Sequence, residues 1–232
     1  MIENVSLCWL IFILCWRQRL VGVDFSHTIN VAGADIQFSE LVKLLGVTLD
    51  TSLSFDQHVT NIVRACNFHL RSLWHLRPSL TFESAKSIAT AIVSAGIDYY
   101  NSLLYGTTEQ NLSRLQKVQN AMARILHHVS FQTSATALRQ QLHWLPNRQR
   151  ITYKLATLTF KAKYCLTPLY FHKQLRDQVA RALRSTTAPL FYRPFLSTVF
   201  TSRVFCYSAP QVWNCLGTST NRRTLSVVLG VA

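Results

Sequence analysis

The sequence predicts an α+β protein that is predominantly α: a small N-terminal antiparallel sheet, then a helical bundle, then an irregular C-terminal tail. Between residues 28 and 50 apolar residues alternate with polar ones, as they do in half-buried strands. After Phe55 they recur every three or four residues, as on one face of a helix. The 232 residues are 49% apolar and contain little Gly or Pro, so we expect a folded core rather than disorder throughout.

The expected sheet has three strands. Residues 29–31 and 36–38 read as a hairpin, and residues 42–49 read as the third strand. Within it, Gly46 either permits the close approach of another backbone or relieves the twist of an ordinary strand. Asp50 and Asp56 resemble a pair of catalytic carboxylates, but capping of a turn and of a helix start explains both better.

Three long helices are expected next. The first runs for about five turns from Phe55 and ends before Pro78. The second has Thr81 as its N-cap and ends near residue 98. Each helix has an apolar stripe that is expected to face the core. These stripes are Val59, Ile62, Val63, Cys66, Leu70, Leu73 and Trp74 in the first helix, Ala85, Ile88, Ala89, Ile92, Gly96 and Ile97 in the second, and Leu112, Leu115, Val118, Met122, Ile125 and Val129 in the third.

A fourth helix is expected after residues 142–146, Leu-His-Trp-Leu-Pro. We expect Trp144 to fill the core and Pro146 to set the start of the helix. Its buried stripe is predicted to be Ile151, Leu155, Leu158 and Ala162. Beyond it, arginines are interleaved with Phe191, Tyr192, Phe195 and Phe200, which are core residues or, alternatively, a base-stacking surface. Pro210 and Trp213 are expected to dock the tail on the helices.

The charge of the chain is +14 and is unevenly distributed. Residues 1–109 carry 7 Lys/Arg and 9 Asp/Glu, whereas residues 110–232 carry 17 Lys/Arg and a single acid, Asp177. A basic half of this kind indicates a phosphate-bearing or anionic-membrane partner, with a solvated basic surface as the alternative. The cations expected on exposed helix faces are Arg64 and Arg71 in the first helix, Arg114, Lys117 and Arg124 in the third, and Arg150, Lys154 and Lys161 in the fourth.

The six cysteines form no Cys-x-x-Cys pair, which favours free thiols in a reducing compartment. Cys66 and His69 form a lone Cys-x-x-His, whereas a structural zinc site needs four ligands. We therefore predict no metal site and no cofactor.

An apolar run occupies residues 5–16 and is followed by Arg17 and Arg19. Twelve residues make ~18 Å of helix, which is shorter than the ~30 Å hydrocarbon core of a bilayer. We interpret residues 1–24 as an apolar leader outside the domains that follow. The alternatives are a core strand or helix and a membrane anchor.

Six short motifs carry a resemblance when they are taken in order. They are residues 45–50 (Leu-Gly-Val-Thr-Leu-Asp), 53–58 (Leu-Ser-Phe-Asp-Gln-His), 97–104 (Ile-Asp-Tyr-Tyr-Asn-Ser-Leu-Leu), 115–121 (Leu-Gln-Lys-Val-Gln-Asn-Ala), 142–146 (Leu-His-Trp-Leu-Pro) and 209–214 (Ala-Pro-Gln-Val-Trp-Asn). In this order and spacing they resemble the end of the reverse transcriptase of LINE-type, jockey-like non-LTR retrotransposons. The resemblance spans roughly residues 28–216 and is lost beyond Leu216.

The resemblance implies a domain order and a partner. Residues 25–54 would be a primer-grip-like sheet with Leu45 and Gly46 at the grip, residues 55–130 a thumb-like helical domain, residues 131–216 a basic helical region and residues 217–232 a divergent tail. The implied partner is RNA or an RNA–DNA duplex, bound with weak specificity inside the cell, in the nucleus or cytoplasm.

The resemblance does not extend to catalysis. The polymerase chemistry of that family uses an Asp-Asp turn, and this chain contains no Asp-Asp pair. We therefore expect a truncated remnant that lacks the catalytic palm and is not an enzyme by itself. The alternatives are a small membrane-anchored protein and a relic without function.

Overall fold

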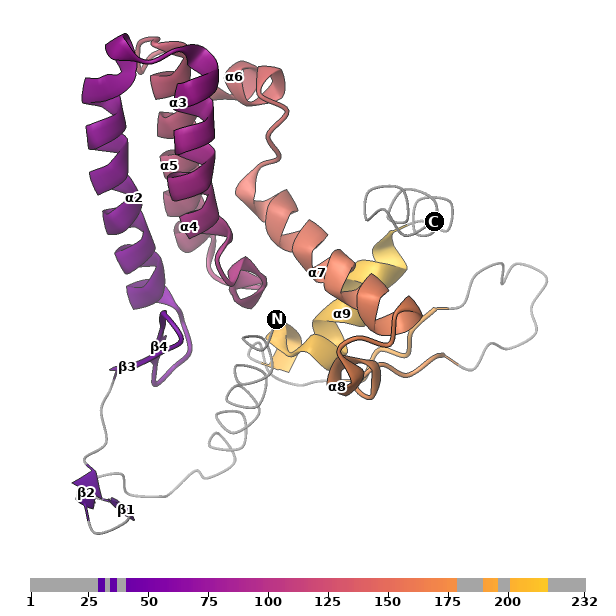
Figure 1. Ribbon diagram of the computed structural model, residues 1–232. Helices are drawn as coiled ribbons and strands as arrows, with labels where there is room; N and C mark the ends of the chain where they lie inside the picture. The colour runs from indigo at the N-terminus through magenta and orange to yellow at the C-terminus, as the bar shows by residue number, and fades with distance from the viewer. Residues whose placement is uncertain (1–28, 32–33, 37–40, 179–189, 196–200, 217–232) are drawn as a thin grey trace, which may run out of the picture. The chain divides into compact units, whose positions relative to one another are not determined.

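The computed structural model describes residues 29–31, 34–36, 41–178, 190–195 and 201–216 (Figure 1). It confirms the fold class, since the chain is mostly helical with small antiparallel pairing near its N-terminus. The chain divides into two compact units, residues 1–58 and residues 59–232. The predictions made for the leader 1–24, for Phe200 and for the tail 217–232 lie outside the described residues.

The described residues of the first unit form two separate two-stranded sheets instead of the expected three-stranded one. β1 (Ile29–Val31) pairs with β2 (Ala34–Ile36), and β3 (Leu41–Leu44) pairs with β4 (Val47–Asp50), both antiparallel. The expected third strand is broken by a two-residue turn at Leu45 and Gly46, whose φ angles are 46° and 82°. Two successive positive φ values are typical of the turns that close tight hairpins, so Gly46 serves the turn rather than a close backbone approach.

The end of this hairpin is held by side chains. The Asp50 carboxylate accepts hydrogen bonds from the backbone N–H groups of Ser54 (2.8 Å) and Phe55 (2.9 Å) and from the hydroxyls of Ser52 and Ser54. The backbone N–H of Thr48 donates to Nδ1 of His58 (3.4 Å), and burial lowers the pKa of this imidazole, which favours the neutral form that can accept. The capping role predicted for Asp50 is confirmed.

The described helical segments follow in chain order. They are α2 (Asp56–Leu76), the 3₁₀ turn η1 (Arg77–Ser79), α3 (Phe82–Ala89), the π-helical segment η2 (Thr90–Ser94), α4 (Ala95–Asp98), the 3₁₀ turn η3 (Asn101–Leu104), α5 (Glu109–His127), α6 (Ala135–Gln141), α7 (Asn147–Tyr164), α8 (Leu169–His172), the 3₁₀ turn η4 (Thr201–Arg203) and α9 (Phe205–Cys215). Thr81 caps α3 as predicted, with its hydroxyl accepting from the N–H of Ser84. Pro146 stands directly before α7, also as predicted.

One apolar core joins α2, α3, α4, α5 and α6. In Figure 1, α2, the α3–α4 segment and α5 lie side by side, and α6 lies beside one end of them. Its buried members are Cys66, Leu70, Leu73, Ala85, Ala89, Val93, Ile97, Val118, Met122, Ala123, Ile125, Leu126, Leu138 and Leu142. Trp144 packs against this core but is only half-buried. Because the core extends to Leu138 and Leu142, it is continuous across the boundary expected at residue 130.

The segment from Phe82 to Asp98 differs from the predicted helix in its buried face. Ala85, Ala89, Val93 and Ile97 are buried at intervals of four, while Ile88 and Ile92 are exposed. The π-helical segment between α3 and α4 keeps Val93 and Ile97 in line with Ala89, because in a wider turn residues four apart stay on one side.

Two polar networks fix the later helices. Gln119 of α5 donates from Nε2 to the carbonyl oxygen of Leu145 (2.9 Å), and the N–H of Asn147 donates to Oε1 of Gln116 (3.0 Å). These bonds attach residues 142–147 to α5. Near the C-terminus, Asn214 exchanges two hydrogen bonds with the backbone of Phe191, of 3.0 and 2.9 Å.

The predicted docking of residues 209–214 is confirmed. Pro210 and Trp213 are buried in α9, and Trp213 forms a small apolar cluster with Phe160 of α7 and Phe191. α7 and α9 therefore pack together through aromatic rings.

Candidate nucleic-acid interface

α2 carries two of the predicted cations on its outward face. Arg64 and Arg71 are seven residues apart, lie opposite the buried Cys66, Leu70 and Leu73, and are exposed. Neither forms an ion pair within the part of the chain that the structure describes. Asp56 at the first position is the helix's single acidic residue, so no carboxylate on α2 neutralises the pair.

The stripe predicted on α5 does not present three free cations. The Arg114 guanidinium donates to the hydroxyl of Thr60 in α2 (2.9 Å), and Arg124 donates from Nε to the carbonyl oxygen of Thr133 (3.0 Å). Both side chains are half-buried in these structural contacts, whereas Lys117 is exposed. Helical spacing identified the stripe, but it could not show which neighbouring segments would use its donors.

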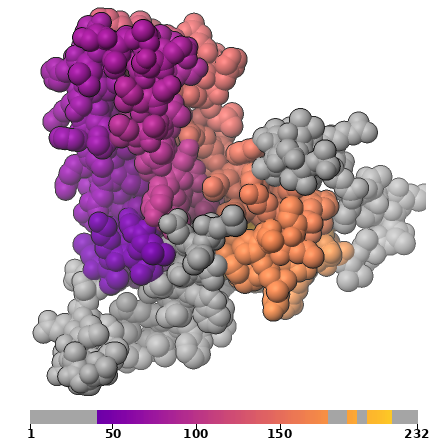
Figure 2. Space-filling view, viewed as in Figure 1, coloured from indigo at the N-terminus to yellow at the C-terminus, as the bar shows by residue number. Residues whose placement is uncertain are grey.

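Lys117 nevertheless lies beside α2. The bond from Arg114 to Thr60 joins one end of the two helices, and the rings of Trp74 and His128 lie 6.0 Å apart at the other end. The helices therefore run parallel as neighbours, and Lys117, three residues after Arg114, is exposed next to the side of α5 that contacts α2. We call the exposed Arg64, Arg71 and Lys117 the basic face. In Figure 2 the purple spheres of α2 lie on the surface of the second unit.

The cations predicted on α7 have different environments. Arg150 forms an ion pair with Asp98, whose other carboxylate oxygen accepts from Nδ2 of Asn101 (3.1 Å). Lys154 and Lys161 are exposed and unpaired within the described residues. Arg150 is therefore neutralised at short range, as is Lys163 by Asp177, and the unpaired positive charge that α7 presents to solvent comes from Lys154 and Lys161.

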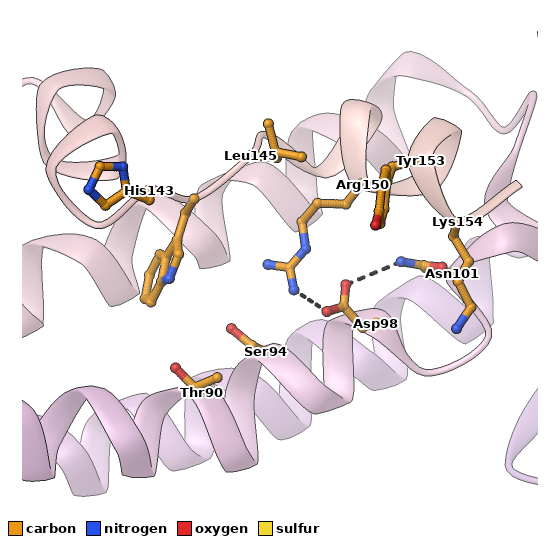
Figure 3. A pocket seen from close by; sticks show the side chains of 10 residues that line it. Thr90, Ser94, Asp98, Asn101, His143, Leu145, Arg150, Tyr153 and Lys154 are labelled. Atoms are coloured by element: carbon orange, nitrogen blue, oxygen red, sulfur yellow. Dashed lines mark hydrogen bonds and ion pairs between the residues drawn. The ribbon is translucent and has the colours of Figure 1, made fainter. Parts of the chain in front are cut away.

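Arg150 and Lys154 line a pocket of about 370 Å³ (Figure 3). The remaining lining residues are Thr90, Ser94, Asp98, Asn101, His143, Trp144, Leu145 and Tyr153. Figure 3 shows Thr90, Ser94 and Asp98 projecting from one side of the same helical segment, with the Arg150 guanidinium pointing toward Asp98. The pocket offers hydroxyls and one ammonium group, which are groups that can hold a small polar molecule. Because Arg150 is already paired with Asp98, the pocket is a poor binding site for the phosphates of a nucleic acid.

The sequence contained no signal for this pocket. Asp98 and Arg150 are 52 residues apart, and the π-helical turn that places Thr90 and Ser94 in line was not expected. The amide oxygen of Asn101 is buried there without a hydrogen-bond partner.

Two further sets of predicted residues are placed elsewhere. Leu45 and Gly46 form the exposed tip of the β3–β4 hairpin. Of the C-terminal aromatics, Phe191 is buried, whereas Tyr192 and Phe195 are exposed, and the Arg193 guanidinium lies over the ring of Tyr207, 4.8 Å from its centroid.

Few acids offset the charge of the second unit. Residues 59–232 contain 21 Lys/Arg and four Asp/Glu. Three of those acids form ion pairs, Asp98 with Arg150, Glu109 with Arg148, and Asp177 with Lys163 (3.4 Å). The basic face is therefore not compensated by a neighbouring acidic cluster on its own helices.

Cys66 and His69 are not arranged as a ligand pair. Cys66 is a core residue, and burial raises the pKa of its thiol to about 11, whereas His69 is exposed on α2. Among the described residues, no group of three or more His, Cys, Asp or Glu is placed to hold a metal ion. In the same part of the chain, no helix combines the length and the apolar character needed to cross a membrane. The apolar run 5–16 lies outside it.

No known protein family, curated protein or solved structure matches this chain. The inference about its function therefore depends on the ordered motifs in the sequence and on the chemistry of the basic face.

Proposed function

We propose that this chain binds RNA or RNA–DNA duplexes without sequence preference, as the thumb-like remnant of a non-LTR retrotransposon reverse transcriptase. The observation that carries the proposal is the basic face. Arg64, Arg71 and Lys117 are exposed on two neighbouring helices, and no described acid pairs with them. Lys154 and Lys161 add exposed positive charge on α7.

Long, flexible cationic side chains suit the phosphate backbone. Lys and Arg neutralise phosphates and release condensed counterions, which gives affinity that is sequence-independent and falls steeply with salt. Contacts of this kind position a protein on a duplex but do not read its bases. A face with three cations on two parallel helices therefore fits a role in holding a nucleic acid rather than in selecting one.

The proposal does not include catalysis. Phosphoryl transfer by polymerases requires carboxylates that hold divalent metal ions. The sequence has no Asp-Asp pair, and Asp50, Asp98, Glu109 and Asp177 already serve as a turn cap or as ion-pair partners. We propose that the chain is not an enzyme by itself and needs no cofactor.

The test measures duplex binding by the full chain at increasing salt concentration. Binding is monitored by fluorescence anisotropy, on several duplexes of unrelated sequence. We expect equal affinities for these duplexes and a linear fall of log affinity with log salt concentration. The variant R64Q/R71Q should flatten this dependence. The variant K173Q/R176Q, which removes the same charge from exposed positions elsewhere, is the matched control. If the parent chain binds no duplex at low salt, the proposal is wrong and the relic interpretation is favoured.

A further inference from the structure

Three large aromatic side chains are exposed next to the basic face. Phe68 and Trp74 of α2 are 66% and 44% exposed, and Phe131, which follows α5, is 67% exposed. The rings of Trp74 and Phe131 are stacked, with centroids 6.5 Å apart and planes inclined by 29°. Large aromatic rings are usually buried, so an exposed stacked pair indicates a surface that binds something.

Phe68 and Trp74 alternate with the cations along α2. Phe68 is four residues after Arg64 and three before Arg71, and Trp74 is three after Arg71, so that each ring is a helical neighbour of an arginine. His128 joins the group because its ring lies 6.0 Å from that of Trp74. We call Phe68, Trp74 and Phe131 the aromatic platform.

We infer that the aromatic platform binds unpaired bases of single-stranded RNA or DNA, while Arg64 and Arg71 hold the adjoining phosphates. This inference rests on the proposed function and adds a ligand to it. Proteins that bind single strands without sequence preference combine a basic track with aromatic rings on which successive bases stack. In a duplex the bases are already stacked on one another, so the platform contributes to single-strand binding and not to duplex binding.

Charge argues against a second copy of this chain as the occupant of this exposed apolar surface. A second copy of this chain would bring its own Arg64 and Arg71 toward the same positive surface. α2 offers no acid beyond Asp56 with which to pair them. A polyanion with exposed ring faces complements both the arginines and the aromatic rings.

The test compares binding of an oligothymidine and a DNA duplex by the full chain and by the variant F68S/F131S. Stacking on an aromatic side chain is a substantial part of the affinity for a single strand, so we expect the variant to bind the oligothymidine about tenfold more weakly or worse. Duplex affinity should stay within about twofold of the parent value, because the phosphate contacts are unchanged. Y192S/F195S, which removes two exposed aromatic residues elsewhere, is the control and should bind like the parent.

A second measurement does not depend on the fold of that variant. Binding of oligothymidine should quench tryptophan fluorescence in the parent chain, and W74F should lose most of the quenching. The inference is overturned if F68S/F131S keeps its single-strand affinity, if Y192S/F195S loses it instead, or if W74F is quenched like the parent. It is also overturned if F68S/F131S changes the oligomeric state and leaves single-strand binding intact. Failure of the parent chain to bind any nucleic acid would instead refute the proposed function.

Discussion

Replacing Gln119 with Met should destabilise the second unit by about 2 kcal/mol, because it removes one of the two amides that hold residues 142–147 to α5. Gln119 is 0% exposed, and its Nε2 donates to the carbonyl oxygen of Leu145 (2.9 Å). Its Oε1 accepts from Nε2 of Gln116 (2.9 Å). Methionine has a similar volume, so the substitution removes the hydrogen bonds and leaves little cavity.

The magnitude follows from which groups lose their partners. Gln116 keeps a second acceptor in Oδ1 of Asn120 (2.9 Å), so its amide remains partly satisfied. The substitution removes two hydrogen bonds, from Gln119 to the carbonyl of Leu145 and from Gln116 to Gln119, and each contributes about 1 kcal/mol. For a unit of this size, 2 kcal/mol corresponds to a fall in Tm of roughly 4–8 °C.

The assay is urea denaturation of the full chain, with unfolding monitored by circular dichroism. Gln110→Met, at an exposed position in the first turn of the same helix, is the matched control and should change the free energy of unfolding by less than about 0.5 kcal/mol. If Gln119→Met and Gln110→Met unfold at the same urea concentration, the amide network does not hold these residues and the reasoning is refuted.

Two further predictions concern titratable groups. Burial raises the pKa of the Cys66 thiol to about 11. In the native chain, iodoacetamide should therefore alkylate the exposed Cys165 well before Cys66, as followed by mass spectrometry. Equal alkylation rates at the two cysteines would contradict the buried position of Cys66. Burial alone would raise the pKa of Asp50, but hydrogen bonds from Ser54, Ser52 and Phe55 lower it below the ordinary 3.8. Its contribution to stability is therefore complete above pH 3.8 and is lost as the pH falls through the lower native value. Asp50→Asn should thus have a lower free energy of unfolding than the parent at neutral pH, and this difference should shrink in acid. If denaturation experiments show the same difference at every pH, the Asp50 carboxylate does not stabilise the turn.

Local chemistry made much of the fold predictable. Thr81 as an N-cap, Pro146 before a helix and Asp50 as a turn cap each depend on residues within a few positions in the sequence, and all three are found. The long helices were predictable because an apolar stripe at helical spacing must pack against something. The hairpin at Leu45 was missed because leucine rarely adopts positive φ, so its sequence reads as a continuous strand.

The candidate site was less predictable for a different reason. Helical spacing places Arg64, Arg71 and Lys117 on surfaces, but it contains no information about partners distant in sequence. Arg150 is neutralised by Asp98, and Arg124 is occupied by the carbonyl of Thr133 in the loop after α5. The π-helical segment from Thr90 to Ser94 and the exposure of Ile88 and Ile92 likewise have no local sequence signal.

The salt dependence of duplex DNA binding by R64Q/R71Q and K173Q/R176Q tests the central claim most directly. Each phosphate that is neutralised contributes about −0.9 to the slope of log affinity against log salt. If Arg64 and Arg71 both contact phosphates, R64Q/R71Q should flatten the slope by up to about 1.8, while K173Q/R176Q should leave the parent slope unchanged. Equal slopes for the two variants, or a larger change in K173Q/R176Q, would contradict the assignment of binding to the basic face.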